Sequence, residues 1–155
     1  MSNFQLALPV PPTPHQLLEL IREWGPNEFN RFRSQHPNTH IHFQEARFEV
    51  KLCGAYLRGL KLRDCQFMRI DATHVDFEGA DLRGAIFAGT SLFFASFRSA
   101  DLRGAKFFAP ILNGADFNGA NLEGAQFYEP SFYDVRNIPD DVYESWINQL
   151  VRSRK

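Results

Sequence analysis

The sequence predicts an all-β solenoid, a quadrilateral β-helix of about four to five coils with α-helical caps at both ends. A large apolar residue recurs at every fifth position over residues 52–132, and sixteen of these seventeen positions hold Leu or Phe. Nine of the ten glycines lie two residues after one of these positions. Residue type also recurs at a spacing of twenty, with Phe at positions 67, 87, 107 and 127 and Leu at positions 62, 82, 102 and 122.

A period of five fits neither an α-helix nor a β-strand. A helix would spread these residues around its surface, and a strand would alternate them between two faces. The chain must therefore bend once per repeat, at corners where Gly permits unusual backbone angles. The Leu and Phe columns require an even number of repeats in each coil. Two repeats would enclose no core and six would leave a hole, so the sequence predicts four.

The composition indicates one compact domain without a strong electrostatic field. The chain has 155 residues, and its 17 Lys and Arg nearly balance its 18 Asp and Glu. We therefore expect no direct binding to nucleic acid or to an anionic membrane. No apolar run is long enough to span a membrane, and the chain does not begin with a secretion signal. The sequence predicts a cytoplasmic protein in which Cys53 and Cys65 are free thiols, because they fall on outward and inward phases of the repeat.

Residues 1–41 are expected to form a tail and a helical cap. Residues 1–12 are rich in proline and cannot be helical. Residues 13–41 are expected to be the cap. Thr13 is a predicted N-cap, followed by Pro14 at the first helical position and by Gln16, which can reach back to the cap. A second short helix is expected over residues 27–34, with Phe29 and Phe32 on one side.

The β-helix is expected over residues 42–135, with three local departures from the pattern. Leu52 follows Phe48 by only four residues, which predicts a tightened corner between them. Ala72 is the one small residue in the large apolar series, and its larger neighbours are expected to fill the space. Pro110 and Pro130 lack a backbone donor and are expected to interrupt the hydrogen-bond ladder.

Several repeats resemble the A(D/N)LxG unit of the pentapeptide-repeat family. The match is clearest at residues 80–84, 100–104, 115–119 and 120–124, which read ADLRG, ADLRG, ADFNG and ANLEG. The resemblance implies a right-handed quadrilateral β-helix with four pentapeptides in each coil. Residues 28–33 and Pro37 are similar to the Trp-Asn-x-Trp-Arg…Pro lead that precedes the coils in single-domain bacterial members of the family. Here Phe replaces each Trp.

The C-terminal residues 136–155 are expected to form one helix that covers the last coil. Asp140 and Asp141 lie in its first turn, and basic residues lie near its end, which is the charge order that a helix dipole favours. Part of its apolar stripe is free to meet a second copy, as the C-terminal ends do in the quinolone-resistance branch of the family. We therefore consider a homodimer through Val142, Trp146 and Leu150.

The sequence contains no motif for catalysis, cofactor binding or metal binding. It has no phosphate-binding glycine loop, nucleophile elbow or zinc-type cysteine pair. His36, His40 and His42 lie close together, but no Cys or carboxylate at ligand spacing completes a metal site, so a solvated cap segment is the preferred interpretation. Asp140 and Asp141 are adjacent in sequence, so their side chains do not converge and are not expected to act as an acid–base pair. Proteins of the resembled family are rarely catalytic, and we expect a non-enzyme without cofactor, metal or small-molecule substrate.

The outward residues divide into four faces when sorted at a spacing of twenty. Two faces are charged or polar. The other two share an edge and present apolar side chains, which usually mark a binding site when they form one patch. The alternative is that the N-terminal helices or the proline-rich lead cover them. The predicted protein interface consists of Met68, Ile86, Phe93, Phe94, Phe108, Ile111, Tyr128 and Tyr133.

These features predict a non-enzymatic module that presents a rigid wall to a protein partner of unknown identity. The alternative is a DNA-mimicking inhibitor or protector of a topoisomerase such as gyrase, which the resemblance to the quinolone-resistance branch raises. Mimicry needs an acidic surface, and residues 52–132 contain nine Asp and Glu against eight Lys and Arg. A secreted effector or a component of a larger assembly has no positive signal in the sequence.

Overall fold

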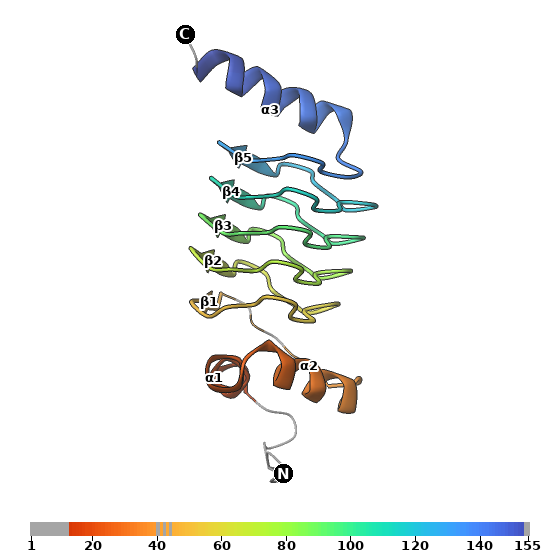
Figure 1. The fold of residues 1–155 in the computed structure, drawn as a ribbon. Helices are drawn as coiled ribbons and strands as arrows, with labels where there is room; N and C mark the ends of the chain where they lie inside the picture. Colours follow the sequence, from red (N-terminus) through yellow and green to blue (C-terminus); the bar gives the residue numbers. More distant parts are fainter. Residues whose placement is uncertain (1–12, 40, 42, 44, 154–155) are drawn as a thin grey trace.

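The computed structural model describes residues 13–39, 41, 43 and 45–153, so the tail expected at residues 1–12 lies outside the described residues. A column of stacked coils stands between helical caps (Figure 1). Two helices, α1 (Pro14–Trp24) and α2 (Pro26–Gln35), lie below the first coil, and α3 (Asp140–Ser153) lies across the last. The described residues contain no helix that is long and apolar enough to cross a membrane.

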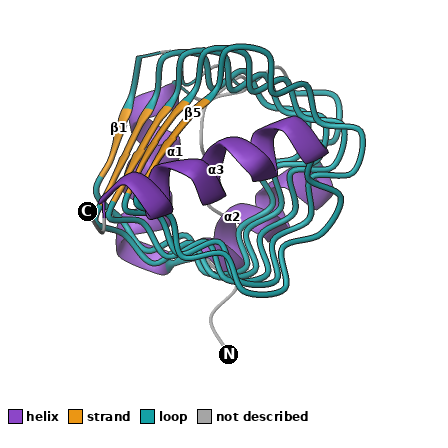
Figure 2. Cartoon of the chain, turned by 90° about the horizontal axis from the view of Figure 1, so that it is seen from above, coloured by secondary structure: helices purple, strands orange, loops and turns teal. Residues whose placement is uncertain are grey.

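One face of the column is a parallel sheet with its strands in chain order. These strands are β1 (Arg47–Phe48), β2 (Gln66–Met68), β3 (Ile86–Ala88), β4 (Lys106–Phe108) and β5 (Gln126–Tyr128). From β2 onward each strand pairs with the residues twenty positions later. The other faces pair through single parallel bridges at the same spacing. Seen from above, the coils superpose around one core (Figure 2). The fold is the predicted right-handed quadrilateral β-helix.

The core is made of stacked columns of Phe and Leu. The rings of Phe67 and Phe87 stack with centroids 4.7 Å apart, and those of Phe87 and Phe107 are also 4.7 Å apart. Phe97, in the next column, meets Phe87 edge to face at 5.8 Å. Both geometries are favourable for aromatic pairs. The seventeen large apolar positions of the repeat therefore form one continuous core rather than separate clusters.

The Asp or Asn of the repeat unit stabilises the bend. Asp116 accepts a hydrogen bond from the backbone N–H of Asn118 at 3.0 Å, and Asn121 accepts one from Glu123 at the same distance. A short side-chain oxygen is what an Asx turn requires, which explains why Asp and Asn are interchangeable at this position.

The two prolines do not interrupt the ladder, so that expectation is wrong. Pro110 and Pro130 occupy the corner after the sheet face. The backbone N–H groups of Ile70 and Thr90, at the same corner of earlier coils, donate no hydrogen bond to any described residue. Proline therefore removes a donor that is unused there. The carbonyl of Pro110 still accepts from the N–H of Ser131 at 2.9 Å.

The repeat begins before Leu52, as the sequence predicts. Phe43 is buried, and its N–H donates to the carbonyl of Lys61. Phe48 pairs with Phe67, nineteen residues later, whereas Leu52 donates to Asp71 in the regular register. The missing residue therefore falls in the corner between Phe48 and Leu52.

The N-terminal cap supplies side-chain partners for the lower edge of the first coil. The side-chain amide of Asn30 donates to the carbonyl of Gly54 at 2.8 Å and accepts from the N–H of Tyr56 at 2.7 Å. The bond from Tyr56 replaces the one that the equivalent residue of the next coil, Asp76, makes to a carbonyl of the preceding coil. Phe29 and Phe32 are buried beneath the coil. The Asn of the family-like lead thus pairs an edge that would otherwise attract other strands.

The C-terminal helix covers the upper end of the core with Trp146. This side chain is 2% exposed, and its ring lies 4.4 Å from that of Phe127 and 5.3 Å from that of Phe132. Val142 is partly buried against the same core. Both residues therefore cover their own last coil, while Val142 keeps part of its surface exposed. A homodimer through this helix stays a prediction. The side chain of Leu150 lies outside the described residues.

Candidate protein-interaction surface

The eight residues of the predicted interface, hereafter the apolar patch, are all at least partly exposed. Phe94 is 51% exposed, Phe108 39%, Ile111 36%, Tyr128 42% and Tyr133 82%. The remaining three, Met68, Ile86 and Phe93, are partly exposed. The N-terminal helices lie below the column and leave these faces uncovered (Figure 1).

Phe108 and Tyr128 form the first aromatic pair of the patch. They are register partners on β4 and β5, and their rings stack with centroids 4.9 Å apart and planes 5° apart. The hydroxyl of Tyr128 donates to Gln126 at 3.1 Å. Cross-strand aromatic pairs are favourable, and here both rings stay partly exposed. The two stacked rings therefore form a fixed, partly exposed apolar surface on the sheet face.

Phe94 forms the second aromatic element, at the corner after the neighbouring face. Its backbone is left-handed, with φ of 54°, at a repeat position that usually holds Gly. Its ring stacks on His74 at 5.1 Å and lies over Gly114, where a Cβ would come within 2.4 Å of the ring. Phe93 lies beside it at 6.3 Å. A left-handed backbone is uncommon for a bulky residue and costs about 1–2 kcal/mol.

Ile111 lies between the two aromatic elements. It bridges to Ser91, which precedes Phe93 by two residues, and it follows Phe108 by three. Asn113, on the same face, accepts from the N–H of Tyr133 at 3.0 Å and so fixes the backbone of that exposed ring. The aromatic elements are therefore connected across one face of the column.

Two predicted members are not joined to the aromatic part. Met68 is separated from Phe108 by the small side chain of Ala88 in the same row. Ile86 lies on the opposite side of the sheet face, between Gln66 and Lys106. Polar neighbours surround it, so it does not extend the patch.

Sequence reasoning missed His74 and Asn113. Both lie twenty residues from a member of the patch, so the column rule places them beside Phe94 and Tyr133. The predicted interface contains only apolar residues, and neither His74 nor Asn113 is apolar.

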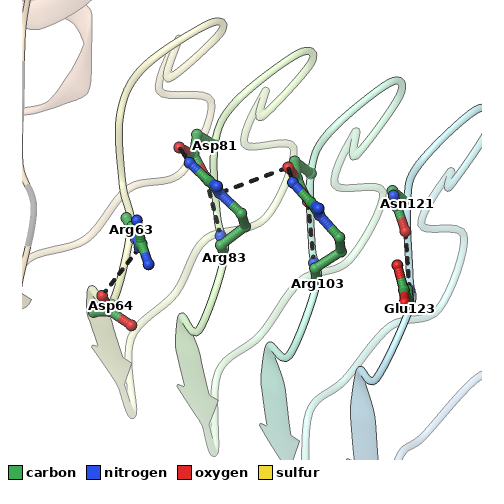
Figure 3. Close-up of polar contacts among 8 residues, drawn as sticks. Arg63, Asp64, Asp81, Arg83, Arg103, Asn121 and Glu123 are labelled. Atoms are coloured by element: carbon green, nitrogen blue, oxygen red, sulfur yellow. Dashed lines mark hydrogen bonds and ion pairs between the residues drawn. The ribbon is translucent and has the colours of Figure 1, made fainter.

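The charged face around Leu82 and Leu102 carries a ladder of ion pairs (Figure 3). Arg83 contacts Asp81 at 2.6 Å and Asp101 at 3.6 Å, and Arg103 contacts Asp101 at 2.7 Å. Hydrogen bonding to Arg83 lowers the pKa of Asp81, and bonding to Arg103 lowers that of Asp101. The carboxylates of Asp64, Asp81 and Asp101 are therefore paired with arginines, and this face is not an acidic surface.

The described residues contain no group of three metal-ligating side chains. His36 stacks on Phe32 and is 3.1 Å from its carbonyl, while His40 and His42 lie outside the described residues. Cys65 is buried, donates to the carbonyl of Phe43, and has its pKa raised to about 12 by burial, whereas Cys53 is exposed and both are free.

The five-residue repeat of this chain matches a known protein-family model. The model described as pentapeptide repeats matches in eight copies, over residues 51–89, 73–107, 100–129 and 112–135, which together span more than half of the chain. The chain belongs to the pentapeptide-repeat family. No sequence among the curated proteins matches it.

Solved structures of other pentapeptide-repeat proteins are similar to it. Rfr23 from the cyanobacterium Cyanothece 51142 is 21% identical, with 63% of this chain and 60% of that chain covered and a TM-score of 0.40. HetL from Nostoc sp. strain PCC 7120, involved in heterocyst differentiation regulation, is 24% identical, with 65% and 59% covered and a TM-score of 0.31. The full-length structure of QnrB1, a plasmid-mediated fluoroquinolone resistance protein, is 13% identical, with 72% and 90% covered and a TM-score of 0.43.

The chain thus spans about 60% of the length of Rfr23 and HetL. These likenesses concern the fold alone.

Proposed function

We propose that this pentapeptide-repeat protein is a non-enzymatic interaction module whose apolar patch binds a protein partner. The observation that carries the proposal is Phe94, a half-exposed aromatic side chain on a left-handed backbone. The other described corners at this repeat position hold Gly or a polar or small residue on the same left-handed backbone, and Phe94 is the one large apolar side chain among them, so stability alone does not explain a Phe there.

The aromatic elements have the properties of interface anchors. Aromatic side chains supply most of the binding energy at interfaces and lose little conformational entropy when they are already fixed. Phe94 is held between His74 and Gly114, and Phe108 is stacked on Tyr128. A β-helical wall with a continuous core adds rigidity, so a partner meets a surface that is already in its bound arrangement.

A DNA-mimicking topoisomerase inhibitor requires an acidic surface. On the charged face, Asp81 and Asp101 are ion-paired with Arg83 and Arg103. No observation favours mimicry over the interaction module.

The test is capture of a partner from cell lysate by the native protein and by a Phe94→Asp, Phe108→Asp double variant. Tyr56→Asp is the matched control, because Tyr56 is 52% exposed but lies outside the patch. We expect the native protein and the control to capture the same partner and the double variant to lose it, with unchanged circular dichroism. Equal capture by all three proteins would refute the proposal, and so would a native protein that forms a stable dimer through these residues.

A further inference from the structure

A cleft of about 570 Å³ lies where the N-terminal cap meets the first coil. It is lined by the end of α2, by the segment that follows it, and by residues 58–61 of the coil. Among the described lining residues the charged ones are Arg33, Arg58 and Lys61, and all three are cationic. The cleft is on the cap, away from the apolar patch.

Arg33 is held in place without a described acidic partner. Its Nη2 donates to the carbonyl of Arg58 at 2.8 Å, and none of the described ion pairs includes it. The Arg33 side chain is partly buried, and this burial lowers its pKa. Guanidinium groups stay protonated in proteins, so Arg33 keeps its positive charge in this partly buried position. An uncompensated, partly buried cation favours an anionic ligand.

Lys61 and Arg58 contribute unequally to the cleft. Arg58 is already engaged by Asp76 at 2.6 Å and Glu78 at 3.2 Å. Lys61 is exposed, lines the cleft, and has no ion pair among the described residues. The positive charge of the cleft that has no ion-pair partner therefore comes from the guanidinium of Arg33, which is held by a hydrogen bond, and from the flexible ammonium of Lys61.

We propose that this cleft binds the phosphate group of a small phosphate ester. The planar guanidinium offers parallel donors to phosphate oxygens, and Lys61 adds a point charge. The cleft volume lies in the range of small-molecule sites, so it has room for more than the phosphate group. The site is independent of the proposed protein interface.

The test is calorimetric titration of the full chain at low ionic strength with three probes: inorganic phosphate, adenosine monophosphate and acetate. We expect saturable binding of both phosphates, tighter binding of the ester, and no binding of acetate. Lys61→Ala should weaken binding of the ester by about fivefold, the upper range for an exposed ion pair. Arg33→Gln should abolish it.

Lys106→Ala is the matched control, since Lys106 is an exposed lysine in the same phase of the repeat but on β4. It should bind as the native protein does. Because Arg33 also contacts the coil, Lys61→Glu is the second variant, and it should lose binding without any change in melting temperature. Absence of saturable phosphate binding, or equal binding by native protein and Lys61→Glu, would overturn the proposal. Equal affinity for inorganic phosphate and the ester would show that the site takes free phosphate.

Discussion

At the scale of single residues, Phe94 is where local stability and the proposed function conflict. Its backbone is left-handed and its ring is half exposed. In Phe94→Gly, relief of about 1–2 kcal/mol of backbone strain offsets loss of the contacts with His74 and Gly114. We expect the free energy of unfolding to stay within about 1 kcal/mol of the native value while partner binding is lost. Urea unfolding measures the first and capture measures the second.

Phe87→Ala is the contrasting variant for that experiment. Phe87 is fully buried between Phe67 and Phe107, and its truncation should cost about 3–5 kcal/mol. If Phe94→Gly proves as destabilising as Phe87→Ala, the ring of Phe94 is a structural element rather than a binding residue.

At the scale of elements, the first coil depends on the amide of Asn30. Asn30→Asp keeps an acceptor for the N–H of Tyr56 but loses the donor to the carbonyl of Gly54. An unsatisfied, partly buried carbonyl costs about 1–3 kcal/mol, so we expect a loss of that size in the free energy of unfolding. Thermal or urea unfolding checks it. Unchanged stability would mean that the cap does not pair this edge.

The charged face should make stability depend on acid pH. Asp81 and Asp101 have folded-state pKa values below the ordinary 3.8 because Arg83 and Arg103 bond to their ionised forms. Their stabilising contribution is therefore present above pH 3.8 and is lost as the pH falls through the lower folded-state values. Asp101→Asn retains the acceptor of the turn, as Asn121 does, but removes the charge. Its melting temperature should fall less between pH 5 and pH 2 than that of the native protein, and an identical fall would contradict the assignment.

At the scale of the whole molecule, the sequence predicts the coils well because each repeat contacts only its neighbours. The five-residue period of the apolar residues and the twenty-residue spacing between coils determine the core, the sheet register and the exposure of Phe94 and Phe108. The ends are less predictable, because their contacts join distant segments. The burial of Trp146 and the amide contacts of Asn30 follow from how the helices dock, which no periodicity encodes. The effect of Pro110 does not follow from the sequence, because the unused backbone donor at its corner is visible only in three dimensions.

The proposed interaction surface is a property of the assembled column, since Phe94, Ile111 and Phe108 come from two successive coils. The most direct test of its function is photo-crosslinking in cells, with p-benzoylphenylalanine in place of Phe94 or, as a control, in place of the exposed Tyr56. We expect one major protein adduct from position 94 and none of that mass from position 56. No adduct at position 94, or the same adducts from both positions, would contradict the claim that the apolar patch binds a partner.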